Sequence, residues 1–259
     1  MSATILRRFP LQRGDDALAF YRQFWSTSMV IHATARRVSY EEHTAPLSIK
    51  CAFGGVESYL VDHARMTVDD STYLVLNHGR PYASWIEGPR DVESLAVFFA
   101  PGFVANVLRD RIRDDDRLLD DPRGKAEPCA FYERRMPHDR SVSPYLRRLR
   151  APARDALWLD EQLHGLASAL LRVHRRNLRE ARRLPAVRAS TRAELYRRLL
   201  RARDAIESDP HARHRLDELA RIACLAPHHF LRRFTDAFGT SPYQYVLAAR
   251  RRKTQFSPA

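Results

Sequence analysis

The sequence predicts an α+β protein with a β-rich N-terminal domain and an all-α C-terminal domain. In the first hundred residues, short segments of β-forming residues alternate with turn residues. From Asp155 onward, apolar residues recur at helical spacing. The last part is basic, because residues 191–259 carry 14 Lys or Arg and 7 Asp or Glu, within a chain of net charge +13. A chain of 259 residues can form two such domains, each with its own core.

Four segments of the N-terminal part have the composition of strands: 47–53, 56–63, 71–79 and 91–101. The turns expected between them lie at Gly54-Gly55, Asp69-Asp70, Gly79-Arg80-Pro81 and Gly88-Pro89. Short strands with regular turns are typical of an antiparallel sandwich or a small barrel. We expect helices at 15–28 and 103–110, and a loop-rich region over 114–137.

A long helix is expected over 155–184, followed by a linker. Leucine and valine recur along it at spacings of four and three, at Leu159, Leu163, Leu166, Leu170 and Val173. This stripe fits either packing against the β-rich domain or a dimer seam, because fewer than three heptads do not establish a coiled coil. The proline and small residues of 184–191 are typical of a linker. The expected domains are therefore 1–183 and 192–259, with the linker 184–191 between them.

The segment Leu216–Arg250 predicts two short helices, a tight turn and a following helix. Acidic residues in the first turn of the first helix favour its positive end. Pro227 suits the start of the second helix, because proline has a preset φ and no backbone N–H. Gly239 is expected to end that helix as a left-handed residue. Three phenylalanines are expected on its buried face: Phe230, Phe234 and Phe238.

The opposite face of the second helix is basic, which favours DNA as a partner. Arginine pairs with guanine through two hydrogen bonds, and side chains near the N-terminus of such a helix can reach base edges. The candidate base contacts are Arg232 and His228, followed by His229 and Arg233. The candidate phosphate contacts are Arg221, Arg250, Arg251, Arg252 and Lys253. The same pattern also fits an ordinary helical hairpin with a solvated basic face.

This segment resembles the first helix-turn-helix of AraC/XylS-family transcription regulators. The matching positions are Leu219-Ala220, Phe230, Arg232, Phe234, Gly239, Ser241-Pro242, Tyr245 and Arg250, preceded by a helix at 192–208. Ala226 stands where the family usually has a serine cap, and Phe230 replaces the usual leucine. The resemblance fades after Arg250, so we expect this sequence to lack the second helix-turn-helix of the family.

The order of the two parts is also that of the AraC family. The resemblance implies that the first part is a cupin-like or related domain for effector binding or oligomerisation. Aromatic residues on its strands could line an effector pocket with an arginine as the anion anchor, although they also fit a plain core. The candidate pocket residues are Tyr59, Tyr73, Arg80, Tyr82 and Trp85.

Several classes of function are disfavoured. The histidines His43, His63 and His78 lack the spacing of a metal-binding cupin, so we expect no metal and no other cofactor. No nucleophile elbow, dinucleotide motif or phosphate loop is present in the sequence. The cysteines Cys51, Cys129 and Cys224 suggest neither zinc nor a disulfide framework, and Cys224 is expected to be buried in the turn. No segment has the pattern of a signal peptide or a membrane span.

We therefore expect a cytoplasmic transcription regulator that is not an enzyme. It would bind double-stranded DNA, respond to a small-molecule effector and form a homodimer without contacting a membrane. One alternative is a shortened regulator that binds DNA poorly and acts by pairing with an intact relative. The other is a cupin-like enzyme with an incidental basic tail.

Overall fold

The computed structural model describes residues 3–6, 20, 26–62, 64–112, 130–152, 155–185 and 188–256. The chain divides into two compact units, Met1–Val173 and His174–Ala259. The division falls inside a long helix, N-terminal to the linker expected at 184–191. The expected helix at 15–28 lies largely outside the described residues, as does most of the expected loop-rich region. No helix of the described part is long and apolar enough to cross a membrane.

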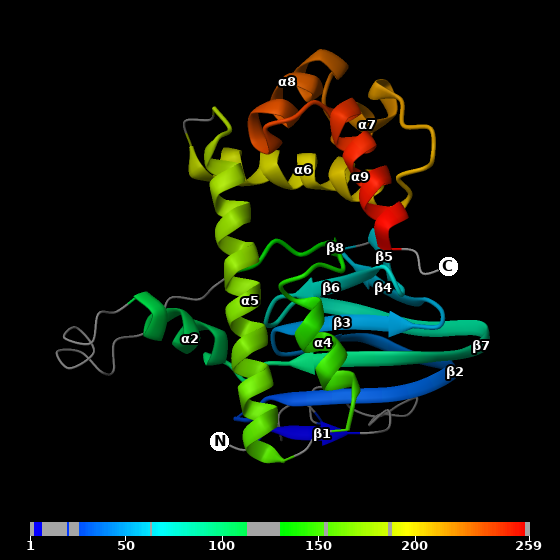
Figure 1. Cartoon of the computed structure of the whole chain (residues 1–259), viewed down its shortest axis with the longest axis vertical. Helices are drawn as coiled ribbons and strands as arrows, with labels where there is room; N and C mark the ends of the chain where they lie inside the picture. Colours follow the sequence, from blue (N-terminus) through cyan, green and yellow to red (C-terminus); the bar gives the residue numbers. More distant parts are fainter. Residues whose placement is uncertain are drawn as a thin grey trace. The chain divides into compact units, whose positions relative to one another are not determined.

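The first unit is built on an eight-stranded sheet within the described residues (Figure 1). Its strands are β1 (Thr4–Leu6), β2 (Met29–Thr44), β3 (Ser48–Phe53), β4 (Glu57–Val61), β5 (Ala64–Val68), β6 (Thr72–Leu76), β7 (Pro81–Phe98) and β8 (Arg135–Pro137). The order is β1-β2-β7-β3-β6-β8, with β4 pairing with both β5 and β7. Among the described strands, only β1 and β2 pair in parallel.

The expected sandwich or cupin-like barrel is corrected to one curved, unclosed sheet. Among the described strands, β1 and β8 end the order and do not pair with each other. The expected turn at Gly88-Pro89 is also wrong, because β7 runs through it. The register with β2 shifts there, between Ala35 and Arg37, and proline is tolerated where the ladder is interrupted. Strand β2 was not expected from the sequence.

The two faces of the sheet bury different sets of side chains. Along β3, Ile49 and Cys51 belong to one core cluster and Ala52 to the other, as the alternation of a strand requires. We call the face with Ile49 and Cys51 the helix face, and the face with Ala52 the inner face. Side chains from both halves of β7, such as Tyr82 and Phe98, meet in the inner-face cluster. The sheet therefore curves around this second core.

Helices of the first unit cover the helix face. They are α2 (Phe103–Ile112), α4 (Ser143–Arg150) and the N-terminal part of α5 (Ala156–Arg182) (Figure 1). The predicted leucine and valine stripe of α5, from Leu159 to Val173, is buried against the sheet in this cluster. Of the two interpretations of the stripe, packing within the chain is the one that the structure shows. The end of α4 is also fixed to β7, because Arg150 donates two hydrogen bonds of 2.6 Å to Glu93.

The second unit is helical, and its described residues form the end of α5 and four further helices. They are α6 (Ala189–Ser208), α7 (Leu216–Ile222), α8 (Pro227–Phe238) and α9 (Pro242–Phe256). Tyr196 of α6 donates a 2.6 Å hydrogen bond to Glu180 of α5, and Arg203 forms an ion pair with the same carboxylate. Both α6 side chains are buried, so this network ties α6 to the end of α5.

Candidate nucleic-acid interface and polar cavity

Helices α7 and α8 form the predicted helix-turn-helix. Leu219, Ala220 and Ala223 are buried on the α7 side, and small side chains at two of these positions allow the helices to approach closely. Phe230 and Phe234 of α8 are also fully buried, and their ring centroids lie 5.4 Å apart. These contacts fix the apolar face of α8, so its opposite face is left for solvent or a partner.

The turn between the helices differs from the expectation in one respect. Cys224 is exposed rather than buried, and its φ of 51° lies in the left-handed region. The turn closes through hydrogen bonds from the Cys224 N–H to Arg221 O and from the Leu225 N–H to Ala220 O.

The ends of α8 follow the sequence prediction. Ala226 is the N-cap residue and supplies no side-chain hydrogen bond, while Pro227 occupies the first turn. Gly239 ends the helix with a φ of 71°, and its N–H donates to Thr235 O at 2.8 Å. Glycine adopts this conformation without the penalty that a Cβ would bring. The helix therefore begins without a side-chain cap and ends with a favourable glycine cap.

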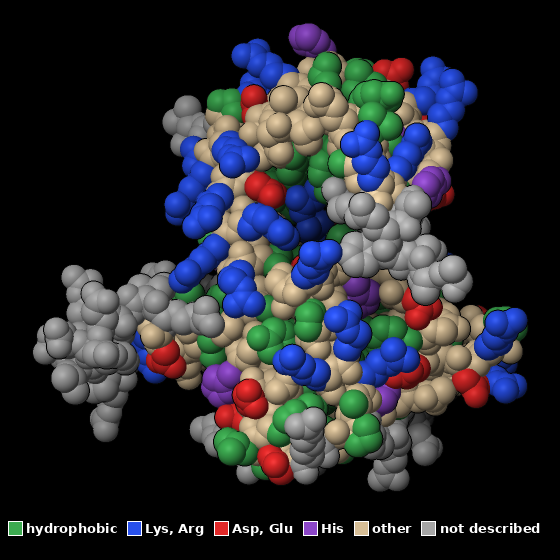
Figure 2. Space-filling model, viewed as in Figure 1, with side chains coloured by type: hydrophobic (Ala, Val, Ile, Leu, Met, Phe, Trp, Pro, Cys, Tyr) green, Lys and Arg blue, Asp and Glu red, His purple; other side chains and the backbone are tan. Residues whose placement is uncertain are grey.

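The exposed face of α8 holds three of the four candidate base contacts. His228, His229 and Arg232 are exposed. Arg233 is mostly buried and forms a 2.9 Å ion pair with Asp236 one turn later. Cationic and histidine side chains lie over this region of the second unit (Figure 2). The arrangement leaves Arg232 and the two histidines available to an external partner, whereas Arg233 is partly engaged within the helix.

The five candidate phosphate contacts have different surroundings. Arg221 and Arg251 are exposed. Arg250 donates hydrogen bonds to the backbone carbonyls of Pro210 (2.7 Å) and Ala212 (3.2 Å), so it holds the segment before α7 in place. The side chains of Arg252 and Lys253 lie outside the described residues.

Aromatic rings on the buried side of α8 pack against α6 and α9. Phe238 contacts Phe234 with ring centroids 4.5 Å apart, and the guanidinium carbon of Arg203 lies 4.8 Å from the centre of the Phe238 ring. Tyr245 of α9 packs edge-on against Phe234 and donates a 2.6 Å hydrogen bond to Glu207 of α6. Sequence reasoning missed this role of Arg203, because an arginine inside a basic helix looks solvated until its partners are known.

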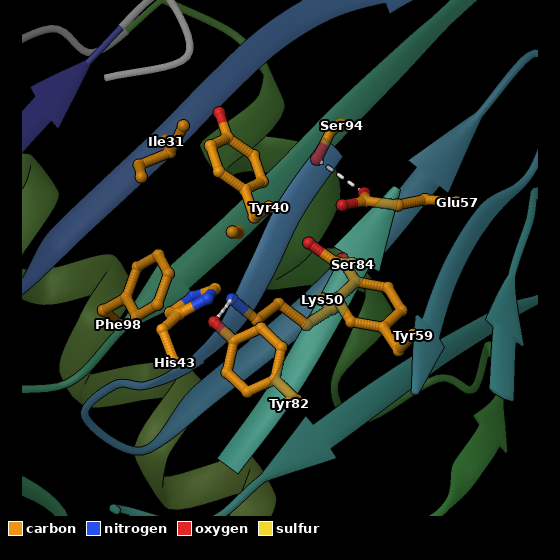
Figure 3. A pocket seen from close by; sticks show the side chains of 11 residues that line it. Ile31, Tyr40, His43, Lys50, Glu57, Tyr59, Tyr82, Ser84, Ser94 and Phe98 are labelled. Carbon is orange, nitrogen blue, oxygen red and sulfur yellow. Dashed lines mark hydrogen bonds between the residues drawn. The ribbon is translucent and has the colours of Figure 1, made fainter. Parts of the chain in front are cut away.

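The first unit contains a small polar cavity on the inner face (Figure 3). It is lined by Ile31, Tyr40, His43, Lys50, Glu57, Tyr59, Tyr82, Ser84, Ser94, Ala96 and Phe98, which come from β2, β3, β4 and β7. Its volume is about 30 Å³. That space holds about two water molecules.

Two ionisable side chains of this cavity are buried. Lys50 is 4% exposed and Glu57 is 5% exposed. Burial lowers the pKa of Lys50 to about 7, although the charge of Glu57 pulls in the opposite direction. Burial likewise raises the pKa of Glu57, which hydrogen bonds from Ser94 and Tyr59 and the charge of Lys50 partly offset. The ordinary preference of both groups for their charged form is therefore weakened here.

Only two of the five predicted pocket residues line this cavity, Tyr59 and Tyr82. Tyr73 is buried in the cluster on the helix face. Arg80 does not serve as an anion anchor in the cavity, because it forms ion pairs with Asp62 and Glu133. Trp85 is likewise absent from the lining, since its neighbours Ser84 and Ile86 are the residues that face inward.

The predicted pocket left out Lys50, Glu57 and His43, although His43 was considered as a possible metal ligand. A signal for Lys50 was present, because it stands in the strand SIKCAF, whose other residues suit a buried strand. A charged residue at such a position is rarely buried without a role. Glu57 gave a weaker signal, since its segment also fits a strand with one solvated face. Among the described residues, no group of three His, Cys, Asp or Glu side chains could hold a metal ion.

No protein-family model matches the sequence, and no curated protein matches it. The structure is similar to wild-type ToxT from Vibrio cholerae strain SCE256 with bound unsaturated fatty acid, with a TM-score of 0.40 and 8% identity, covering 85% of this chain and 94% of that one. It is also similar to the AraC-like transcriptional activator CuxR, with a TM-score of 0.40 and 12% identity, covering 89% and 77%. With scores and identities this low, a function has to be argued from the chain's own residues.

Proposed function

We propose that this protein is a transcription regulator that binds double-stranded DNA through α7 and α8. The exposed face of α8 carries the proposal. His228 and Arg232 lie one helical turn apart on a helix whose opposite face is fully buried. In the major groove, an arginine at this position would pair with guanine and the histidine would reach a neighbouring base edge.

Phosphate contacts would hold this helix in register. Arg221 and Arg251 are exposed and serve this role in the proposal, together with Arg252 and Lys253. Arg250 would contribute indirectly, by fixing the segment before α7 through its two hydrogen bonds to backbone carbonyls. Self-association of two copies would bring two recognition helices to half-sites about one helical turn apart and strengthen binding.

The first unit has the sensing role in this proposal. Its inner-face cavity combines apolar walls with a few polar groups, which is the usual composition of a small-molecule site. The resemblance of the C-terminal segment to AraC/XylS regulators agrees with this division of labour. The effector pocket would be the one around Lys50 and Tyr82, rather than the surface around Arg80 and Trp85.

The direct test is the substitution Arg232→Ala in the full chain. Removing a base contact should weaken binding to a preferred DNA site by about 1–3 kcal/mol and relax the preference at one base position. The measurement is fluorescence anisotropy with the preferred site and its single-base variants.

Arg37→Ala is the matched control, because Arg37 is an exposed arginine of β2 in the other unit. It removes the same charge from the chain and should leave the base preference unchanged. Equal losses of DNA affinity in the two variants, with no change in base preference, would contradict the assignment of Arg232 as a base contact.

A further inference from the structure

The Lys50 side chain points into the inner-face cavity (Figure 3). Its Nζ donates a 2.9 Å hydrogen bond to the Tyr82 hydroxyl and lies 4.0 Å from the centre of the Phe98 ring. An ammonium has three N–H donors, so one hydrogen bond and the ring faces leave donor capacity toward the cavity. A buried amine is costly unless its charge is compensated.

Compensation from the protein itself is incomplete. The ion pairs of the described residues do not include Lys50, so Glu57 stands beyond direct contact with it. The Glu57 carboxylate instead accepts a 2.7 Å hydrogen bond from Ser94. The other titratable groups around the cavity are Tyr40 and His43 of β2, Tyr59 of β4 and Tyr82 of β7. None of them brings a negative charge at neutral pH.

We propose that this cavity binds the carboxylate of a small organic acid, with Lys50 as the residue that pairs with it. The inference deepens the sensing role proposed above and rests on it for its regulatory meaning. A carboxylate has two oxygens and matches a space of about two water molecules. Ile31, Ala96 and Phe98 form apolar walls for the adjacent carbon atoms of the acid.

Binding should be coupled to protonation, because only the ammonium form of Lys50 attracts an anion. With the pKa of Lys50 at about 7, the amine form dominates in the free protein at higher pH. The apparent dissociation constant for the anion should therefore rise about tenfold between about pH 6 and about pH 8. Glu57 should also weaken binding at higher pH, because ionisation of its carboxyl would repel the anionic ligand.

The experiment titrates the full chain with acetate at constant ionic strength and follows the protein by NMR. Acetamide, which has the same shape without the charge, is the control ligand. We expect saturable binding of acetate that weakens about tenfold over the stated pH range, and no comparable binding of acetamide. Absence of acetate binding at the lower pH, equal binding of acetamide, or a flat pH profile would overturn the proposal.

Two variants locate the site. Lys50→Met keeps the length of the side chain and should weaken acetate binding at least tenfold, whereas Arg80→Met should leave it unchanged because Arg80 lies outside the cavity lining. Loss of binding in Arg80→Met with binding retained in Lys50→Met would place the anion elsewhere and overturn the assignment. The pH profile of the unmodified protein decides the question if Lys50→Met does not fold.

Binding of DNA by the same preparation separates this inference from the proposed function. Acetate binding through Lys50 in a protein that shows no affinity for DNA would support the anion site and contradict the regulator role. DNA binding without any acetate binding would overturn the anion site and leave the regulator role standing.

Discussion

The arginines of the second unit show how one residue type takes several roles. Arg232 is exposed on α8, Arg233 pairs with Asp236, Arg250 holds backbone carbonyls, and Arg203 packs on Phe238. The sequence predicts their common charge but cannot separate these roles, because each depends on a partner distant in the chain. The same limit explains why the anion anchor was expected at Arg80 and is proposed at Lys50.

The buried pair Lys50 and Glu57 should cost stability. The folded-state pKa of Lys50, about 7, lies below its ordinary value, so the unfolded chain binds more protons between about pH 7 and the ordinary value of 10.5. The free energy of unfolding contributed by this group therefore rises with pH across that window. The cost of the buried ammonium is fully present below pH 7.

The double variant Lys50→Met/Glu57→Gln tests whether the pair is kept for binding rather than for stability. Lys50 and Glu57 are both buried without forming a direct ion pair, so replacing these two ionisable groups should raise the free energy of unfolding at slightly acidic pH, by about the 1–4 kcal/mol seen when buried ion pairs are replaced. Urea unfolding followed by tryptophan fluorescence reports on the first unit, because all three tryptophans precede residue 174. A destabilised double variant would show that the pair serves the fold.

The exposed pair Arg37 and Glu87 supplies the control for this prediction. Its atoms are 3.6 Å apart on β2 and β7, and both side chains are mostly exposed. The variant Arg37→Met/Glu87→Gln should change the free energy of unfolding by less than about 1 kcal/mol, because exposed ion pairs contribute little.

At the scale of single elements, helices and short strands were predicted best. The segments 47–53, 56–63 and 71–79 correspond to β3, β4 and β6. The helices expected from residue 103 onward correspond to α2, α5, α6, α7, α8 and α9. Strand β2 was missed because its second half is largely exposed and carries charged residues, which blurs the two-residue alternation. Strand β7 was cut in two because Gly88-Pro89 looks like a turn, although here it lies opposite an irregularity in β2.

The N-terminus of α8 offers a test on one element. Ala226 gives no side-chain hydrogen bond to the first-turn N–H groups, so Ala226→Ser should stabilise the helix by about 1 kcal/mol. Hydrogen exchange measured by mass spectrometry should show slower exchange in α7 and α8. The control Ala248→Ser places serine on an exposed position inside α9, where it should not stabilise. Stabilisation by the control but not by Ala226→Ser would contradict the capping account.

At the scale of the whole molecule, the sequence predicts the division into units better than it predicts how the strands pair. The division into a β-rich and a helical unit followed from composition and periodicity, whereas the closed barrel expected from the sequence is not formed by the described strands. Closure depends on the pairing of strands distant in the sequence, and short local patterns do not contain it. The cavity was misplaced for the same reason, since its lining comes from β2, β3, β4 and both halves of β7.

The excess positive charge concentrates in the second unit, where the proposed DNA contacts lie. Anion contacts by exposed arginines release counterions, so DNA affinity should fall as salt rises. Arg221→Gln should reduce the slope of log affinity against log salt by about 1 while leaving the base preference unchanged. These two readouts distinguish phosphate contacts from base contacts in the same assay.

The most direct measurement is selection of the full chain on a randomised DNA pool, repeated across a salt series with the oligomeric state recorded. The proposed function predicts enrichment of a short motif, as one copy or as two copies about one helical turn apart. In Arg232→Ala, the enriched motif should lose its preference at one base position. Weak binding without any enriched motif, lost steeply as salt rises, would contradict sequence-specific recognition by α8.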